Sequence, residues 1–171
     1  KPPSKPELCG YTLQLAMGEG GTGTVYRAQH PETGQTVALK EFHANFIRNK
    51  GHLRDLGKMV KKAQKLEHPN LVKIGQLITN PDENVLVLEF VDGPDLKWYL
   101  STRPYDVNER LVILAQICNA LSHLHDNGLV HHDLKPANIL FTRQGQVKVC
   151  DFNLAGSGGG LLGFMDPGAV E

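Results

Sequence analysis

Three polar side chains stand close together between residues 131 and 138, directly before the apolar run Ile139–Phe141. They are the carboxylate of Asp133, the amine of Lys135 and the amide of Asn138. A carboxylate can accept the proton of a hydroxyl group, an amine can neutralise a phosphate, and an amide oxygen can bind a divalent cation. Phosphoryl transfer requires these three groups. The segment therefore predicts a site that moves a phosphoryl group onto a hydroxyl.

A second candidate is the glycine pattern formed by Gly18, Gly20 and Gly23, which Val25 follows. Glycines let backbone amides approach phosphate oxygens with no side chain between them. By itself this pattern is weak, because any tight turn uses glycine. A dinucleotide-binding fold would need a helix directly afterwards, whereas residues 24–28 have the composition of a strand. The pattern favours a glycine-rich β-hairpin.

Two further short motifs carry charged side chains next to apolar runs. Lys40 ends the apolar run Val37–Leu39, and Asp151 begins the triplet Asp151-Phe152-Asn153. A lysine at the end of a strand is usually an edge charge, and an aspartate after a strand is common in loops. Each motif would be unremarkable alone, and the significance lies in their order along the chain.

In this order and at these separations, the four motifs resemble those of the eukaryotic-like protein kinase catalytic domain of the serine/threonine type. The resemblance runs from about Gly10 to the end of the chain. It implies that Asp133 is the catalytic base, that Lys135 contacts the transferred phosphate, and that Asn138 and Asp151 bind Mg²⁺. It also implies that Phe152 packs near His131.

The resemblance implies a binding site for ATP as well. Lys40 would hold the α- and β-phosphates, Ala38 would line the adenine pocket, and Leu140 would form its floor. Leu88 falls at the gatekeeper position, before a hinge whose backbone would bind adenine. The expected ATP-binding residues are Gly18, Gly20, Gly23, Val25, Ala38, Lys40, Leu88, Glu89, Val91, Leu140 and Asp151.

The sequence also departs from the family pattern. The glutamate that normally pairs with the strand lysine is replaced by Met59, and Asp55 is the acid that could substitute for it. Asn153 stands in place of a glycine, and His132 in place of an arginine. The segment from Gly160 to Gly168 resembles the close of the activation segment, without its final glutamate. The helices that normally follow are absent, so we expect a truncated domain.

Hydrophobic periodicity predicts a β-rich half followed by a helical half. We expect strands over 11–17, 24–29, 36–41, 71–78 and 84–91, and a helix over 53–66. A helix over 108–125 should turn Leu111, Leu114, Cys118, Leu121 and Leu124 inward. The expected fold is α+β and bilobal, with a five-stranded antiparallel N-lobe plus one helix and a shortened helical C-lobe. The expected divisions are a tail at 1–9, an N-lobe at 10–91 and a partial C-lobe at 92–171.

Composition sets milder bounds. The 171 residues contain 18 basic and 18 acidic side chains, so charge points to no nucleic-acid or membrane partner. The three cysteines show no metal-binding spacing, and reduced thiols fit a cytoplasmic location. No apolar run has the length of a membrane span.

Two functions remain open at this point. The first is Mg²⁺-dependent phosphotransfer from ATP to a protein hydroxyl, which the intact Lys40, Asp133, Asn138 and Asp151 favour. The alternative is a pseudokinase that binds nucleotide or regulates a partner protein, which Met59, Asn153 and the shortened C-lobe favour. An uncovered apolar face on the 108–125 helix would require a partner protein or a homodimer.

Overall fold

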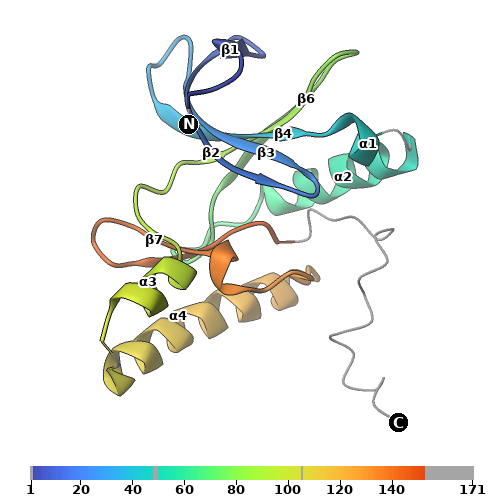
Figure 1. Ribbon diagram of the computed structural model, residues 1–171. Coiled ribbons are helices and arrows are strands. Elements are labelled where there is room, and N and C mark those ends of the chain that lie inside the picture. Colours follow the sequence, from blue (N-terminus) through green and yellow to red (C-terminus); the bar gives the residue numbers. More distant parts are fainter. Residues whose placement is uncertain (1, 48–49, 105, 153–171) are drawn as a thin grey trace. The chain divides into compact units, whose positions relative to one another are not determined.

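The computed structural model describes residues 2–47, 50–104 and 106–152, shown in colour in Figure 1. The chain divides into two compact units. Unit 1 comprises Lys1–Lys65 and Val72–Phe90, and unit 2 comprises Leu66–Leu71 and the residues from Val91 onward. The short segment Leu66–Leu71 therefore belongs to unit 2, although residues of unit 1 flank it on both sides.

Unit 1 is built on one antiparallel sheet of six strands, in the order β1-β2-β3-β4-β6-β5. Neighbouring strands in this order are hydrogen-bonded to each other, and Figure 1 shows them in blue to green. The strands are β1 (Glu7–Leu8), β2 (Tyr11–Gly20), β3 (Gly23–Gln29), β4 (Thr36–Phe42), β5 (Ile74–Thr79) and β6 (Asn84–Glu89).

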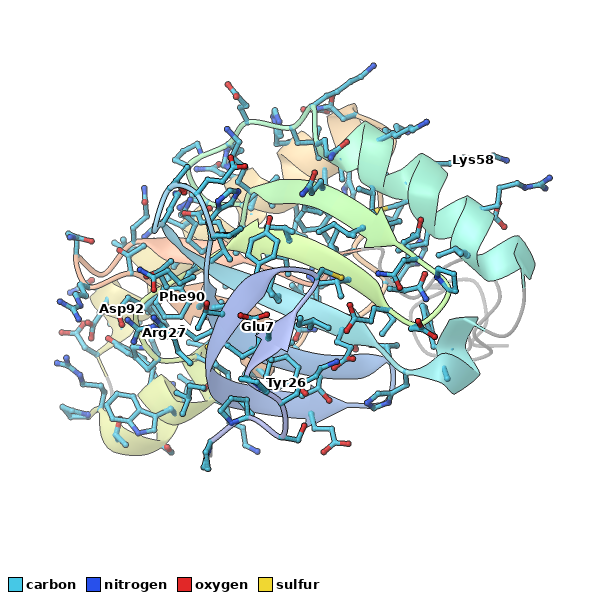
Figure 2. All side chains as sticks on the ribbon, turned by 90° about the horizontal axis from the view of Figure 1, so that it is seen from above. Glu7, Tyr26, Arg27, Lys58, Phe90 and Asp92 are labelled. Atoms are coloured by element: carbon cyan, nitrogen blue, oxygen red, sulfur yellow. The ribbon has the colours of Figure 1, made fainter. Side chains whose placement is uncertain are left out.

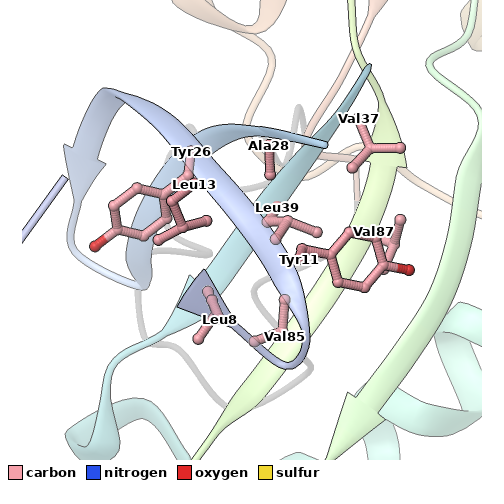
Figure 3. Packing of buried hydrophobic residues seen from close by; sticks show 9 residues of the cluster. All are labelled: Leu8, Tyr11, Leu13, Tyr26, Ala28, Val37, Leu39, Val85 and Val87. Carbon is pink, nitrogen blue, oxygen red and sulfur yellow. The ribbon is translucent and has the colours of Figure 1, made fainter. Parts of the chain in front are cut away.

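One face of this sheet carries the apolar core of unit 1 (Figure 3). Alternate residues along each strand point to the same face, so Val37 and Leu39 of β4 meet Val85 and Val87 of β6 there. The remaining members come from β1, β2 and β3 and are Leu8, Tyr11, Leu13, Tyr26 and Ala28. Ala38 and Lys40 alternate with these core residues of β4 and therefore point to the opposite face.

The first strand corrects the sequence-based interpretation of residues 1–9 as a tail and of the sheet as five-stranded. Glu7–Leu8 pairs with β2, and Leu8 is only 1% exposed. Cys9 and Gly10 both have positive φ, at 50° and 83°, which turns the chain back onto β2. The composition rich in proline and charge concealed this single apolar anchor.

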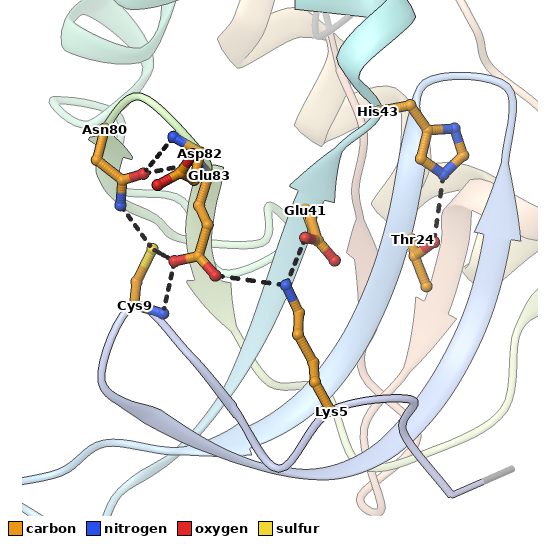
Figure 4. Close-up of polar contacts among 8 residues, drawn as sticks. All are labelled: Lys5, Cys9, Thr24, Glu41, His43, Asn80, Asp82 and Glu83. Atoms are coloured by element: carbon orange, nitrogen blue, oxygen red, sulfur yellow. Dashed lines mark hydrogen bonds and ion pairs between the residues drawn. The ribbon is translucent and has the colours of Figure 1, made fainter.

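Polar contacts fix the same segment from outside the core (Figure 4). The Lys5 amine pairs with the carboxylates of Glu41 at 2.7 Å and Glu83 at 3.4 Å. Glu83 also accepts hydrogen bonds from the Cys9 amide and thiol. Burial, followed by the hydrogen bond to Glu83, raises the pKa of the Cys9 thiol to about 11. The thiol therefore stays protonated and acts as a donor in this contact.

Two helices complete unit 1, namely α1 (Ala44–Ile47) and α2 (Lys50–Ala63). Leu56, Val60 and Ala63 of α2 are buried, at the spacing of one helical face. The sequence predicted this helix and its apolar face correctly, but not the short α1.

In its described residues, unit 2 contains two α-helices, a 3₁₀ turn and a two-stranded hairpin. Its elements are α3 (Leu96–Thr102), α4 (Val107–Asp126), η1 (Pro136–Asn138), β7 (Ile139–Phe141) and β8 (Val147–Val149). Asp95 caps the N-terminus of α3, and Asp106 caps that of α4, each by accepting backbone N–H groups. No helix in the described part of the chain is both long and apolar enough to cross a membrane.

Helix α4 corrects the predicted inward face. Its buried residues are Ile113, Ile117, Ala120 and Leu124, whereas Leu111 and Leu114 are 58% and 53% exposed. Both sets recur at helical spacing, because α4 carries two apolar stripes. Periodicity finds the stripes but does not decide which one the fold covers. Of the predicted inward residues, Leu124 is buried, Leu121 is half-buried and Cys118 is exposed.

Candidate functional site

The candidate residues of the 131–138 segment in unit 2 form one hydrogen-bonded group around Asp133. The Lys135 amine lies 2.6 Å from Asp133 Oδ2, and both side chains are about half exposed, at 52% and 53%. The Asn138 amide NH₂ donates to the Asp133 carbonyl at 2.8 Å and to Oδ2 at 3.2 Å. The structure thus brings Asp133, Lys135 and Asn138 together, with the carboxylate accessible from outside.

His131 holds this loop to the segment that carries Asp151. Its Nε2 donates to the Cys150 carbonyl at 2.9 Å, and its Nδ1 accepts the Asp133 amide at 3.2 Å. This pair of contacts specifies the neutral ring with its proton on Nε2. Burial lowers the pKa of His131, whose side chain is 4% exposed, so the neutral form is favoured.

His131 was not among the sequence-based site candidates, although its contact with Phe152 was expected. The two rings meet edge to face at a centroid distance of 6.5 Å, and Phe152 is 2% exposed. A buried histidine beside an exposed His132 carries no distinguishing sequence signal of its own. Only the predicted motif order placed these two rings near each other.

Two residues of the site have left-handed backbone without being glycine. His132 has φ 64° and Asp151 has φ 58°. This conformation is uncommon for residues with a Cβ, and it concentrates at functional sites where surrounding contacts hold it. Here the hydrogen bonds of His131 to both segments supply such contacts.

Asn138 and Asp151 fit a site for a hard divalent cation. Because the Asn138 NH₂ group donates to Asp133, its amide oxygen is the atom suited to a metal. The Cys150 amide donates to the Asn138 carbonyl at 3.0 Å, which ties the residue before Asp151 to Asn138. One amide and one carboxylate oxygen are ligands that Mg²⁺ accepts. Among the described residues there is no cluster of three or more His, Cys, Asp or Glu side chains that could hold a metal.

Unit 1 carries the other group of candidates on the sheet face opposite its core. Val25 lies opposite Lys40 in the β3–β4 register, and Ala38 lies opposite Leu88 in the β4–β6 register. All four side chains therefore share one face. Lys40 is buried at 6% exposure, which is rare for lysine. A lysine among apolar residues on one sheet face fits a role that requires its charge.

The three motif glycines differ in whether the fold leaves space for a Cβ atom at their positions. A Cβ on Gly23 would collide with the Glu41 carbonyl oxygen, whereas Gly18 has nothing within 4 Å and Gly20 only a contact at 4.0 Å. Packing against β4 thus explains Gly23. It does not explain Gly18 and Gly20, where the absence of a side chain leaves the backbone accessible.

The hairpin between β2 and β3 is also tied to the end of β4 by a histidine that sequence analysis missed. The His43 amide donates to the Thr22 carbonyl at 3.1 Å. The His43 ring lies 3.3 Å from the Thr24 hydroxyl, and Figure 4 marks this contact with a dashed line. His43 follows directly after β4. These contacts fix the glycine-rich hairpin to the strand that carries Lys40.

The expected hinge residues have defined backbone environments. The Glu89 carboxylate accepts the Lys73 amide at 2.9 Å, and the Glu89 amide donates to the Lys73 carbonyl. Phe90 ends unit 1 and lies 5.1 Å from the Arg27 guanidinium, a contact seen in Figure 2. Val91 and Leu140, both half-buried, belong to unit 2. The predicted ATP-binding residues therefore divide into one group in each unit.

The structure describes the surroundings of Met59 and Asp55, two of the residues involved in the departures from the family pattern. Met59 is half-buried on α2, and the ion pair that the structure gives to Asp55 is with Lys58, at 3.7 Å. The substitution of Asp55 for the family glutamate thus gains no support. Asn153 and the predicted close of the activation segment, at 160–168, lie outside the described residues.

Comparison with known proteins identifies the family. The model of the protein kinase domain matches residues 11–159. The chain belongs to the protein kinase family. The serine/threonine-protein kinase PrkC of Bacillus subtilis is 35% identical to it over 146 residues, which cover 85% of this chain and 22% of PrkC. Pkn1 of Myxococcus xanthus is 34% identical over 152 residues, covering 86% of this chain and 22% of Pkn1.

Solved kinase structures agree with the sequence relatives. A double mutant of the Mycobacterium tuberculosis PknI kinase domain superposes on this kinase chain with a TM-score of 0.78 at 27% identity. The match covers 86% of this chain and 62% of the PknI chain. The expected α+β kinase fold is therefore confirmed. The chain spans about a fifth of the length of the first bacterial relatives, at 22%.

Proposed function

We propose that this chain transfers the γ-phosphoryl group of ATP to a serine or threonine hydroxyl of a protein. The observation that carries the proposal is the arrangement around Asp133, where Lys135 and Asn138 both contact one carboxylate oxygen. That contact fixes the orientation of the carboxylate while the side chain stays half exposed. An accessible, oriented carboxylate suits the positioning of a substrate hydroxyl.

The residues have distinct proposed roles in one displacement. The substrate hydroxyl oxygen forms a bond to the γ-phosphorus, and the bond from that phosphorus to the β,γ-bridging oxygen breaks, which releases ADP. The hydroxyl proton passes to the Asp133 carboxylate. Lys135 neutralises charge on the transferred group, and Lys40 does so on the phosphates that remain with the nucleotide.

Asn138 and Asp151 are the proposed ligands of Mg²⁺. The cation would neutralise charge on the phosphates when it is bound. The proposed ATP-binding residues in unit 1 are Gly18, Gly20, Gly23, Val25, Ala38, Lys40, Leu88 and Glu89. Those in unit 2 are Val91, Leu140 and Asp151.

We further propose that the chain acts in the cytoplasm on a protein substrate, with no nucleic-acid or membrane partner. The even charge balance supports the lack of a nucleic-acid or membrane partner. A regulatory protein or a second copy of the chain is the proposed occupant of the exposed apolar stripe of α4. Val107, Leu111 and Leu114 of this stripe are each more than half exposed.

The test uses labelled ATP with Mg²⁺ and a generic protein substrate. Asp133→Ala should reduce transfer by about 10²–10⁴-fold, because the acceptor loses its positioning base. Asp126→Ala is the matched control, since Asp126 is also an exposed aspartate of unit 2, at the end of α4, and it should transfer like the unaltered chain. Equal transfer by all three proteins would show that the chemistry lies elsewhere.

The second candidate function is a pseudokinase that binds nucleotide without transferring phosphate. Met59 in place of the family glutamate supports it, together with the pairing of Asp55 to Lys58. Calorimetry with Mg·ATP separates the two functions when it is run beside the transfer assay. Binding without transfer would favour the pseudokinase, and the absence of binding by folded protein would contradict both.

A further inference from the structure

Two stacked histidines join the segment Leu66–Leu71 to helix α4 within unit 2. The ring of His68, from the segment, lies on the ring of His123, from α4, with centroids 5.0 Å apart and planes inclined by 29°. Both side chains are half-buried. Two imidazoles can stack closely when both are neutral, but two imidazolium rings in this position would repel each other.

The hydrogen bonds of His68 require a neutral ring. Its Nδ1 accepts the Asn70 amide at 3.1 Å, and the Leu71 amide donates to the His68 carbonyl at 3.1 Å. An acceptor nitrogen carries no proton, so the ring proton resides on Nε2. Adding a proton to Nδ1 would place two hydrogens face to face and break the bond to Asn70. The turn that Asn70 completes thus depends on the charge state of His68.

Asn70 connects this turn to α4 and to the β7–β8 hairpin. Its side-chain NH₂ donates to Gln116 Oε1 of α4 and to the Val147 carbonyl of β8, both at 2.9 Å. Gln116 Oε1 also accepts the Val147 amide at 3.0 Å. The Asn70 carbonyl accepts the Val149 amide at 2.8 Å. Asn70 is 6% exposed, and its bond to the Val147 carbonyl is buried.

The same hairpin leads directly into the candidate metal site. Val149 ends β8, and the next residue, Cys150, donates its amide to the Asn138 carbonyl at 3.0 Å. Asp151 follows. Val149, whose amide binds the Asn70 carbonyl, therefore lies only two residues before Asp151, whose carboxylate we propose as a metal ligand.

The electrostatic surroundings of His68 oppose its protonation. Burial, the neighbouring His123 and the Lys148 of β8 all lower the pKa of His68 from its ordinary value of 6.5. The Lys148 amine also donates to the Leu71 carbonyl at 3.3 Å, which keeps this cation at the segment. Glu67 is the acid adjacent in sequence, and its side chain is exposed.

Because the pKa of His68 is lowered in the folded chain, acid should decrease the stability of the turn. Because the folded state binds the proton of His68 less well than the unfolded state, its contribution to stability is present above pH 6.5. The contribution is lost as the pH falls from 6.5 toward the lower folded-state pKa. Mild acid should therefore loosen the turn.

We propose that the His68–His123 stack is a proton-sensitive attachment, through which mild acid releases Asn70 from the β7–β8 hairpin. His68 would thus act as a positioning residue for Asp151. The consequence for Asp151 rests on the proposed phosphotransfer function, whereas the attachment itself does not.

The test is amide hydrogen exchange at Val149, measured as a protection factor so that the intrinsic pH dependence of exchange cancels. Between about pH 7.5 and about pH 5.5, protection of the unaltered chain should fall by up to roughly tenfold, because pH 5.5 lies one unit below the ordinary pKa of 6.5. His68→Asn should remove this fall, because an asparagine oxygen can accept the amide two residues on but does not titrate. The readout requires no nucleotide and no activity.

His125→Asn is the matched control, since His125 is an exposed histidine on the same helix as His123. It should keep the pH dependence of the unaltered chain. His123→Tyr retains a ring but not the charge, so the pKa of His68 measured by NMR should rise toward 6.5. His131 is present in every variant, so any effect of its titration on protection at Val149 is common to all of them and does not contribute to the differences between variants. Protection at Val149 that falls equally in the unaltered chain and His68→Asn would overturn the proposal, as would a His68 pKa at or above 6.5.

Discussion

At the residue scale, the site is specified by backbone contacts as much as by the motif side chains. His131 is an example, because its two ring nitrogens bind the backbone on either side of the candidate site. The motif residues Asp133, Lys135 and Asn138 could be selected from the sequence because their chemistry is explicit. The supporting role of His131 could not, since a histidine in a loop has many possible environments and its burial arises only from tertiary packing.

The glycines of the β2–β3 hairpin give a residue-scale prediction that separates folding from binding. Gly23→Ala should lower the free energy of unfolding by about 1–3 kcal/mol, because its Cβ would collide with Glu41 on β4. Gly20→Ala should leave stability nearly unchanged, since its Cβ would meet only one atom, at 4.0 Å. If Gly20 approaches a phosphate, the same change should weaken Mg·ATP binding by about 1.5 kcal/mol, or somewhat more than tenfold.

Thermal unfolding and calorimetry on both variants provide the measurements. The two glycines are matched controls for each other, because they lie opposite one another in the β2–β3 register. If Gly20→Ala binds Mg·ATP as tightly as the unaltered chain, this part of the hairpin does not contact the phosphates.

At the element scale, strands and helices with a clear period could be predicted, whereas β1 and α1 could not. The long α4 and the five longer strands β2, β3, β4, β5 and β6 lie within a few residues of their expected positions. β1 has two residues and α1 four, too few to show a period. β1 exists because Leu8 packs into the core of unit 1, which is a tertiary effect.

The buried side chain of Leu8 should contribute much of the stability that β1 adds to unit 1. Leu8→Ala should lower the free energy of unfolding by about 2–5 kcal/mol, because it deletes a buried side chain from the core of unit 1. Glu7→Ala is the control on the same strand, and it should cost about 0.5 kcal/mol or less because Glu7 is exposed. Denaturant unfolding compares the two variants. Equal stabilities would mean that β1 is not an integral part of the unit.

At the scale of the whole molecule, the fold class and the order of the motifs were predictable because a kinase domain distributes its motifs along the chain in a fixed order. The assignment of Leu66–Leu71 to unit 2 was not predictable. It depends on Asn70, whose buried bonds to Gln116 and Val147 join residues far apart in sequence. A polar side chain of this kind gives no periodic signal, so its partners emerge only in three dimensions.

The two apolar stripes of α4 lead to the prediction at this scale. One stripe is buried in unit 2, and the other, with Val107, Leu111 and Leu114, is exposed over side chains large enough to drive association. We expect the chain to self-associate through this second stripe. A symmetric dimer would bury this stripe, because the same stripe on a second copy offers a complementary apolar surface.

Replacing Leu111 and Leu114 together by aspartate should shift the chain to monomer, because each aspartate would lose hydration in a buried contact. Asn119→Asp is the control on the same helix, exposed and outside the stripe, and it should not change the mass. Light scattering across a wide concentration range measures the outcome. The substituted leucines are exposed, so the double variant should keep its helical circular dichroism. An unaltered chain that stays monomeric throughout would contradict self-association and leave a different protein as the proposed occupant of the stripe.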